Sequence, residues 1–272
     1  MNGPLFWLIV LTYGLATLLM ARNLYKQIAR PSVIVWWLAL AGWIGHAFAL
    51  GRAVYMQTGG VAVDLSGSLD AVALVLGFLF LTGWRISRLE GRSVGILLLP
   101  VVVVALLGAR FLKSADPATS SLLSDPLLIP HLLFSLFAYG LFSVAVVLAL
   151  LDAYQEHALK KKQFGRIFNM LPSLGVVEES LFVMIRMGFL LLSLSIFSGI
   201  VYTKARLGVW FMLSHKVVFS WATWLTFATL LLGNRFYGWR GGRAVRITLG
   251  GYLLLALGFL GVKVVTELIL KR

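Results

Sequence analysis

The stretch from Pro130 to Leu151, PHLLFSLFAYGLFSVAVVLALL, decides the fold, because its 22 residues include no Asp, Glu, Lys or Arg. About 20 apolar residues in an α-helix cross the hydrocarbon core of a bilayer, so this stretch predicts a transmembrane helix. Seven more segments qualify or nearly qualify in the same way. The eight predicted segments cover residues of about 5–21, 33–51, 67–84, 94–110, 130–151, 181–202, 215–233 and 245–265. They fill the chain, which predicts an all-α, polytopic transmembrane helix bundle that forms one membrane domain over residues 1–272.

The composition agrees with a chain whose solvent is the lipid bilayer. Hydrophobic residues make up 60% of the sequence and charged residues only 12%, whereas a soluble domain carries about 25% charged residues. The net charge of +14 comes from short basic clusters between long apolar runs, a distribution typical of cytoplasmic loops and not of a nucleic-acid-binding surface. There are no cysteines, which excludes disulfides and thiolate metal sites.

The basic residues also predict the orientation of the bundle. Loops on one side of the eight segments hold 14 Lys and Arg residues, and the opposite side holds 9. The richer side is expected to be cytoplasmic, which places both termini outside (N-out/C-out). The first basic residues follow the first apolar segment and do not precede it, so this segment is expected to be a retained helix and not a cleaved signal peptide.

Three of the four histidines fall at the outer ends of predicted helices. His46 lies near the outer end of the second segment, His131 opens the fifth and His215 opens the seventh. On the fifth segment, Ser135 and Tyr139 follow His131 at i+4 and i+8, so the three share one helix face. The sixth segment carries a similar polar stripe, made of Ser195, Ser198 and Tyr202. The pattern predicts an outward-opening pocket of imidazole, hydroxyl and aromatic groups.

Imidazole is the commonest metal ligand in proteins, and two imidazoles on facing helices could supply both axial positions of a haem iron. Basic residues around the pocket would suit the propionates of the porphyrin; they are Arg52, Arg110, Lys204, Arg206 and Lys216. A zinc site is less expected, because no acidic or thiolate ligand accompanies the histidines within the predicted segments. Histidines that merely hydrogen-bond neighbouring helices or headgroups would produce the same pattern, and this alternative stays open.

Short segments, mostly in the second half of the chain, carry a resemblance to a known family. They are His131–Tyr139, Leu171–Leu174 with Glu178, Gly188–Leu194 with Ser198–Gly199, His215–Lys216 with Trp224, the turn Gly238–Gly241, and His46 within Gly45–Ala47. Together they resemble the cytochrome c assembly family, the CcmC/CcsA-like haem-handling membrane proteins, and within it a small YpjD/HemX-like inner membrane branch. The resemblance implies a multi-pass protein of the bacterial inner (plasma) membrane.

In the haem-handling members of that family, histidines flank an outer tryptophan-rich loop that presents haem. The resemblance implies that His131 is the first flanking histidine and that residues 207–216 are a reduced form of this loop, which keeps Trp210. Where a second flanking histidine would follow the seventh segment, this chain has Gly233-Asn234. The hypothesis therefore takes haem b as the cofactor, with His131 and His215 as iron ligands and His46 as an alternate ligand. The residues expected to bind the cofactor are His46, His131, His215, Trp210, Tyr139 and Arg206.

The leading hypothesis is therefore haem binding or haem handling on the outer, periplasmic face, with haem and another membrane protein as partners besides the bilayer. The first alternative is a structural or regulatory membrane protein that keeps the fold without haem delivery. A secondary transporter is less expected, because such proteins usually carry an ionisable coupling group near the midplane, and Asp70, Asp152 and Glu267 all lie near segment ends. No G-x-S-x-G, Walker or Rossmann pattern occurs, so no enzymatic activity is expected.

Overall fold

The fold is an antiparallel bundle of α-helices in a computed structural model, which describes residues 3–26, 32–56, 65–86, 92–111, 125, 127–162, 164–165, 168–210 and 214–258. Within these residues there are eight α-helices, one 3₁₀ turn at Phe168–Met170 and no strand. The helices are α1 (Pro4–Tyr25), α2 (Val33–Met56), α3 (Leu65–Ile86), α4 (Arg92–Phe111), α5 (Leu128–Lys160), α6 (Leu174–Leu207), α7 (His215–Tyr237) and α8 (Gly241–Ala256). The predicted all-α bundle is confirmed.

Six of these helices, α1, α2, α3, α5, α6 and α7, are long and apolar enough to cross a membrane. In α4 the apolar part, Leu97–Phe111, is shorter. The eighth predicted segment, 245–265, lies only partly within the described residues, where α8 ends at Ala256. Helices α5 and α6 contain 33 and 34 residues, or about 50 Å at 1.5 Å per residue. They are therefore longer than the roughly 30 Å hydrocarbon core and extend beyond it.

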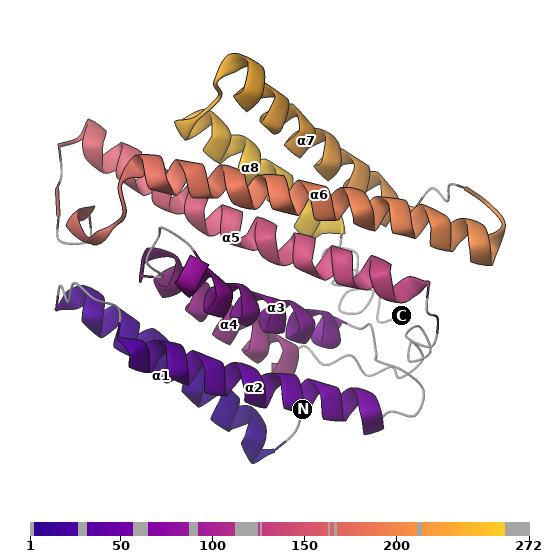
Figure 1. The fold of residues 1–272 in the computed structure, drawn as a ribbon, viewed down its shortest axis with the longest axis horizontal. Coiled ribbons are helices and arrows are strands. Elements are labelled where there is room, and N and C mark those ends of the chain that lie inside the picture. The colour runs from indigo at the N-terminus through magenta and orange to yellow at the C-terminus, as the bar shows by residue number, and fades with distance from the viewer. Residues whose placement is uncertain are drawn as a thin grey trace.

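Helix α5, which contains the stretch 130–151, connects the two halves of the bundle. Each helix runs antiparallel to the one before it, and α5 lies between the α1–α4 half and the α6–α8 half (Figure 1). It packs most extensively against α6 and also contacts α3, α4 and α8. Every residue from Ala138 to Ala145 is buried, as expected of a helix that is apolar all round and surrounded by other helices.

The centre of the second half is built around two stacked phenylalanines. The rings of Phe142 on α5 and Phe227 on α7 lie 4.0 Å apart at an angle of 13°, and both side chains are fully buried. Gly188 of α6 allows this stack, because a Cβ at that position would lie 3.0 Å from the Phe142 ring. The absence of a side chain at Gly188 lets α5 and α6 approach closely, as small residues commonly do in membrane helix pairs.

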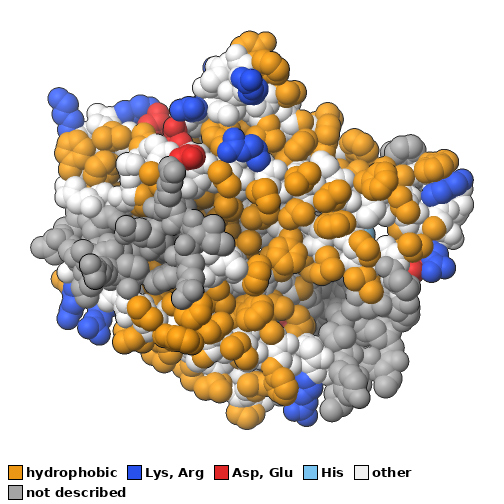
Figure 2. Space-filling model, in the orientation of Figure 1, with side chains coloured by type: hydrophobic (Ala, Val, Ile, Leu, Met, Phe, Trp, Pro, Cys, Tyr) orange, Lys and Arg blue, Asp and Glu red, His pale blue; other side chains and the backbone are white. Residues whose placement is uncertain are grey.

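The surface matches a protein immersed in lipid. Hydrophobic side chains cover most of the described surface in Figure 2, whereas Lys and Arg gather toward the ends of the helices. Exposed apolar residues follow one another along α6 at helical spacing and include Leu190, Leu194, Phe197 and Val201. In water such a continuous apolar face would mark an interface, but in a bilayer it is the surface that contacts the acyl chains.

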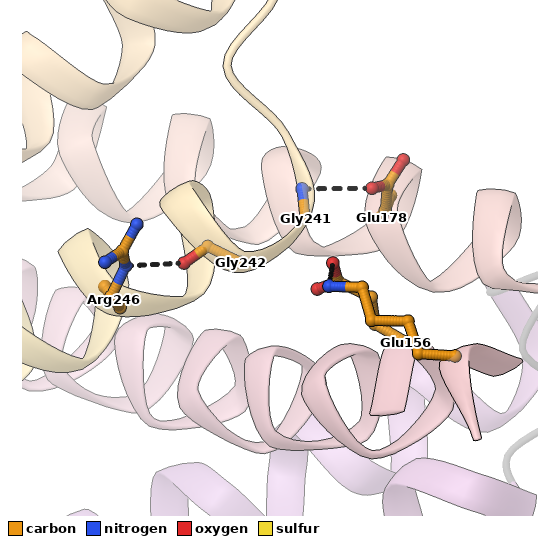
Figure 3. Close-up of polar contacts among 6 residues, drawn as sticks. Glu156, Glu178, Gly241, Gly242 and Arg246 are labelled. Carbon is orange, nitrogen blue, oxygen red and sulfur yellow. Dashed lines mark hydrogen bonds and ion pairs between the residues drawn. The ribbon is translucent and has the colours of Figure 1, made fainter. Parts of the chain in front are cut away.

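At the end of the bundle where α8 begins, carboxylates from two other helices meet its N-terminus (Figure 3). The backbone N–H of Gly241 donates to Glu178 of α6 at 3.1 Å, and α8 has no capping side chain of its own. Glu156 of α5 lies nearby: a Cβ on Gly242 would be in van der Waals contact with its Oε2, at 3.4 Å, while its Oε1 accepts from Lys160 at 2.6 Å. Negative charge at a helix N-terminus is favourable, so the hydrogen bond to Glu178 anchors the start of α8 to α6.

Candidate functional site

The antiparallel order of the helices brings three histidines toward one end of the bundle, opposite the end where Glu178 caps α8. The C-terminal end of α2 and the N-terminal ends of α5 and α7 all lie there (Figure 1). His131 is the fourth residue of α5, His215 is the first residue of α7, and His46 is in the C-terminal half of α2. His157 belongs to the other end of α5. His131 and His215 therefore share one end of the molecule, whereas His46 lies just past the middle of α2, on the side toward that end.

His131 is held by the backbone of α6. Its Nδ1 lies 2.8 Å from the carbonyl oxygen of Ser195. A carbonyl oxygen can only accept, so Nδ1 carries the proton and Nε2 keeps its lone pair. Within the described part of the chain, no hydrogen bond engages Nε2. Histidines that bind a metal are typically oriented in this way, with the second ring nitrogen donating to a carbonyl or carboxylate.

The predicted polar stripes of the fifth and sixth segments meet around this histidine. The hydroxyls of Ser135 and Ser195 are 2.6 Å apart, and Ser135 also donates to the backbone carbonyl of His131 at 2.6 Å. Ser198 donates to the same Ser195 carbonyl that His131 uses, at 2.9 Å. The interface between α5 and α6 thus contains a connected hydroxyl and carbonyl network that fixes the imidazole.

Gly199 gives the imidazole room against α6. A Cβ at this position would lie 3.1 Å from both Nδ1 and Cε1 of His131, closer than ordinary side-chain packing permits. The resemblance described above includes Gly199 but assigns it no role. Gly199 follows Ser195 at i+4 and therefore lies on the same face of α6. This spacing is the only signal in the sequence for the contact between Gly199 and the His131 ring.

Tyr139, the third residue of the α5 stripe, lies deeper in the bundle and contacts α8. Its ring centre is 5.6 Å from that of Tyr252, and the Tyr252 hydroxyl is 2.8 Å from the hydroxyl of Ser143. Tyr139 is buried. Tyr139 thus packs against α8 through its ring, and Ser143 makes the polar contact of α5 with that helix.

His46 is fully buried in the first half of the bundle and lies beside an acidic residue of α3. Its Nε2 is 3.3 Å from Oδ1 of Asp70; the distance is that of an ion pair, although the angles fall outside hydrogen-bond geometry. Its Nδ1 is buried with no hydrogen-bond partner among the described residues. Asp70 does lie near the start of α3, as expected, but its carboxylate is mostly buried. The sequence offered no signal for this pairing.

Arg206 and Trp210, both predicted to contact the cofactor, lie at the exposed end of α6. Arg206 makes a two-pronged ion pair with Asp125, with Nε and Nη2 at 2.5 and 2.8 Å from the two carboxylate oxygens. Trp210 is 59% exposed, and the ammonium group of Lys204 lies 5.1 Å from the centre of its ring. The hydrogen bond from Arg206 lowers the pKa of Asp125 below its ordinary value of 3.8.

The third predicted ligand, His215, is exposed at the start of α7. The N-cap of α7 is Ser214, whose hydroxyl accepts from the backbone N–H of Val217 at 3.4 Å. No hydrogen bond or ion pair joins His215 to His131 or His46 among the described residues. Those residues also contain no group of three or more His, Cys, Asp or Glu side chains placed to hold a metal ion. The candidate ligands are thus single imidazoles on separate helices.

Comparison with known proteins agrees with the helix bundle and the resemblance. The family of the Cytochrome C assembly protein matches residues 5–270. Inner membrane protein YpjD of Escherichia coli (strain K12) is 31% identical over 181 residues, which are 65% of this chain and 67% of that protein. Protein HemX of Brevibacillus brevis is 28% identical over 232 residues, 84% of this chain and 81% of that protein.

A shorter similarity links the chain to Cytochrome c biogenesis protein CcsA of Prochlorococcus marinus (strain MIT 9312), 33% identical over 78 residues, 29% of this chain and 25% of that protein. No solved structure matches the chain significantly. The apolar helices, together with the similarity to an inner membrane protein, place the chain in the bacterial inner membrane. Because the family matches nearly the whole sequence, this chain belongs to the cytochrome c assembly protein family.

Proposed function

We propose that this protein binds haem b at the end of the bundle that carries His131, with His131 as one axial ligand, and that it acts as a non-enzymatic haem-handling protein. The observation that carries the proposal is the hydrogen bond from Nδ1 of His131 to the Ser195 carbonyl, which leaves Nε2 as a free ligand atom. The chain is similar to CcsA, which is named a cytochrome c biogenesis protein. This similarity supports a role in haem handling.

The distribution of Lys and Arg supports an orientation in which this end faces the periplasm. In that orientation the bound cofactor would lie on the outer side of the inner membrane, where cytochrome c assembly needs it. When bound, haem would supply an iron centre that can carry an electron. Alternatively, the haem itself would be passed to a partner. The residues of the chain would hold it: His131 would be one ligand of its iron, and His215 or His46 is the candidate for another.

The absorption spectrum of detergent-purified protein from haem-replete cells tests the proposal. We expect a Soret band that His131→Ala abolishes. His157→Ala is the matched control, because His157 lies on the same helix at its other end, and it should leave the band unchanged. His46→Ala and His215→Ala then identify the second ligand by which of them alters the band. A colourless protein, or a band that survives all three site variants, would refute haem binding here.

One observation favours the alternative of a structural or regulatory membrane protein. Arg206, predicted to meet the haem propionates, already pairs with Asp125 through two hydrogen bonds. A protein of this alternative class should co-purify with a stable membrane-protein partner and show no chromophore. The same purification therefore distinguishes the two functions.

A further inference from the structure

Four exposed arginines lie close together in the sequence where α7 ends and α8 begins. They are Arg235, Arg240, Arg243 and Arg246, and residues 235–246 are called the hairpin end below. Figure 2 shows Lys and Arg side chains over this part of the molecule, at the top of the view. Among the described residues, no carboxylate forms an ion pair with any of the four. The hairpin end therefore carries positive charge that the described part of the chain does not neutralise.

The turn between the two helices is held in one conformation. Gly238 ends α7 in the left-handed region, at a φ of 63°, and the side-chain amide of Asn234 donates to the carbonyl of Trp239 at 3.0 Å. The Trp239 ring lies so close to Gly233 that any side chain there would collide with it. The guanidinium of Arg243 lies 5.2 Å from the centre of the same ring. A cation is thus positioned on a rigid turn before any partner arrives.

The placement of these arginines is unfavourable for the isolated chain. A helix N-terminus carries a positive partial charge and disfavours cations, yet Arg240 is the N-cap of α8 and Arg243 lies in its first turn. Arg246 follows three residues later, and residues at this spacing are neighbours on a helix surface, so their like charges repel. A bound anion would offset both effects.

The carboxylates at the start of α8 do not supply that anion. Glu178 accepts from the first backbone N–H of α8 at 3.1 Å, and Glu156 accepts from Lys160 at 2.6 Å. Figure 3 shows Arg246 donating instead to a backbone carbonyl of its own helix, at 3.2 Å. The negative charge that would balance the arginines must therefore come from another molecule.

The surface beside the arginines indicates which kind of molecule this is. Phe236 and Tyr237, next to Arg235, are 72% and 78% exposed, and exposed aromatic side chains gather at the headgroup level of a bilayer. Leu232 precedes Phe236 by one turn, shares its helix face and is 56% exposed. An acidic soluble partner would match the arginines but not this apolar track, whereas a lipid has both an anionic head and apolar chains.

We propose that the hairpin end is a binding site for an anionic phospholipid, with Arg240, Arg243 and Arg246 around its phosphate and with Leu232 and Phe236 along an acyl chain. A planar guanidinium can donate two parallel hydrogen bonds to phosphate oxygens. The bound phosphate offsets the repulsion among the arginines and their conflict with the helix dipole, so the lipid stabilises the start of α8. This site lies at the end of the bundle opposite His131 and does not depend on haem.

The first experiment titrates phosphatidylglycerol or phosphatidylcholine into the protein in neutral detergent and counts bound lipids by native mass spectrometry. Neutral detergent has no charged surface, so only a lipid in direct contact is retained, and we expect phosphatidylglycerol to be preferred. Each basic residue beside an anionic lipid contributes about fivefold to its affinity, so the double variant Arg240→Gln/Arg243→Gln should bind phosphatidylglycerol about 25-fold more weakly.

Lys161→Gln/Lys162→Gln is the matched control, because it removes two exposed cations at the same end of the bundle; it should leave the affinity unchanged. Equal binding of the two lipids, or equal losses in the two double variants, overturns the site and leaves only a general attraction to negative charge. Inorganic phosphate at the same concentration should not displace the lipid, since it has no acyl chains. Displacement by inorganic phosphate would overturn a phospholipid as the occupant.

The second experiment measures hydrogen exchange at residues 241–246 in nanodiscs of phosphatidylglycerol and of phosphatidylcholine. Exchange should be slower in phosphatidylglycerol for the wild type and for Lys161→Gln/Lys162→Gln, and equal in the two lipids for Arg240→Gln/Arg243→Gln. Each protein is compared with itself, so a general loss of stability in a variant does not imitate the effect. A wild type that exchanges equally in both lipids overturns the proposed stabilisation of α8.

Discussion

The Nδ1 atom of His131 on α5 donates a 2.8 Å hydrogen bond to the backbone carbonyl of Ser195 on α6. This bond joins two helices that pack against each other along most of their length, and it determines which ring nitrogen of His131 is free. A backbone carbonyl cannot be removed by substitution at Ser195, so the contact depends on the relative position of the two helices. Small changes in α6 packing should therefore alter the site.

Gly199→Ala should displace the His131 ring. The added Cβ would lie 3.1 Å from Nδ1 and Cε1 of His131, and overpacking of this kind typically costs about 1–3 kcal/mol of stability. We expect a weaker Soret band on hemin titration and a lower midpoint of thermal unfolding. Gly175→Ala on the same helix is the control, because nothing lies within 4 Å of its Cβ position. Equal effects of the two substitutions would contradict the role assigned to Gly199.

Phe142→Ala should be among the most destabilising single substitutions in the bundle. The Phe142 side chain is fully buried and stacks on Phe227 at 4.0 Å. Phe→Ala substitutions in packed cores cost about 3–5 kcal/mol. Phe197→Ala removes the same side chain from a position that is 67% exposed and faces lipid, so its effect should be small. Denaturant titration in mild detergent measures both, and similar losses for the two would refute the assignment of core and lipid faces.

The ion pair between Asp125 and Arg206 should depend on pH. Because the hydrogen bond from Arg206 lowers the pKa of Asp125 from 3.8, the stabilisation is complete above the ordinary pKa and is lost as the pH falls through the lowered one. The difference in thermal midpoint between wild type and Asp125→Asn should therefore be constant at neutral pH and vanish in stronger acid. In a double-mutant cycle, Asp125→Asn should have no further effect once Arg206→Gln is present. Additive effects of the two substitutions would show that the pair does not couple.

Glu178→Ala should loosen the start of α8. The Gly241 N–H donates to the Glu178 carboxylate at 3.1 Å, and loss of a helix cap costs about 1 kcal/mol. Hydrogen exchange at the first amides of α8 should become faster, while exchange in the middle of α5 stays unchanged. Glu178→Gln keeps an acceptor oxygen and should retain most of the protection. If the alanine variant exchanges like the wild type, the cap does not hold α8.

The histidine pocket was predictable only in outline. The i, i+4 spacing of His131 and Ser135 and the stripe with Ser195 indicated that polar faces of the fifth and sixth segments meet, and the structure joins them. Tyr139 has the same spacing but contacts Tyr252 of α8, because a helix surrounded by partners presents successive turns to different neighbours. The pairing of Asp70 with His46 and of Asp125 with Arg206 was not predicted, because the two residues of each pair lie far apart in the sequence.

The sequence by itself determined the class of the fold and the end at which the histidines lie. Apolar runs of about 20 residues can satisfy their backbone groups in lipid only as helices, and a count of helices before each histidine assigns its end of the bundle. The tertiary structure decided which ring nitrogen of His131 is held and by what, and it placed His46 beside Asp70. In a bilayer the lipid-facing and buried faces are both apolar, so hydropathy does not encode the rotation of a helix about its axis. The backbone carbonyl of Ser195, moreover, is a group that every residue type carries, and only the packing of α6 on α5 makes it the partner of His131.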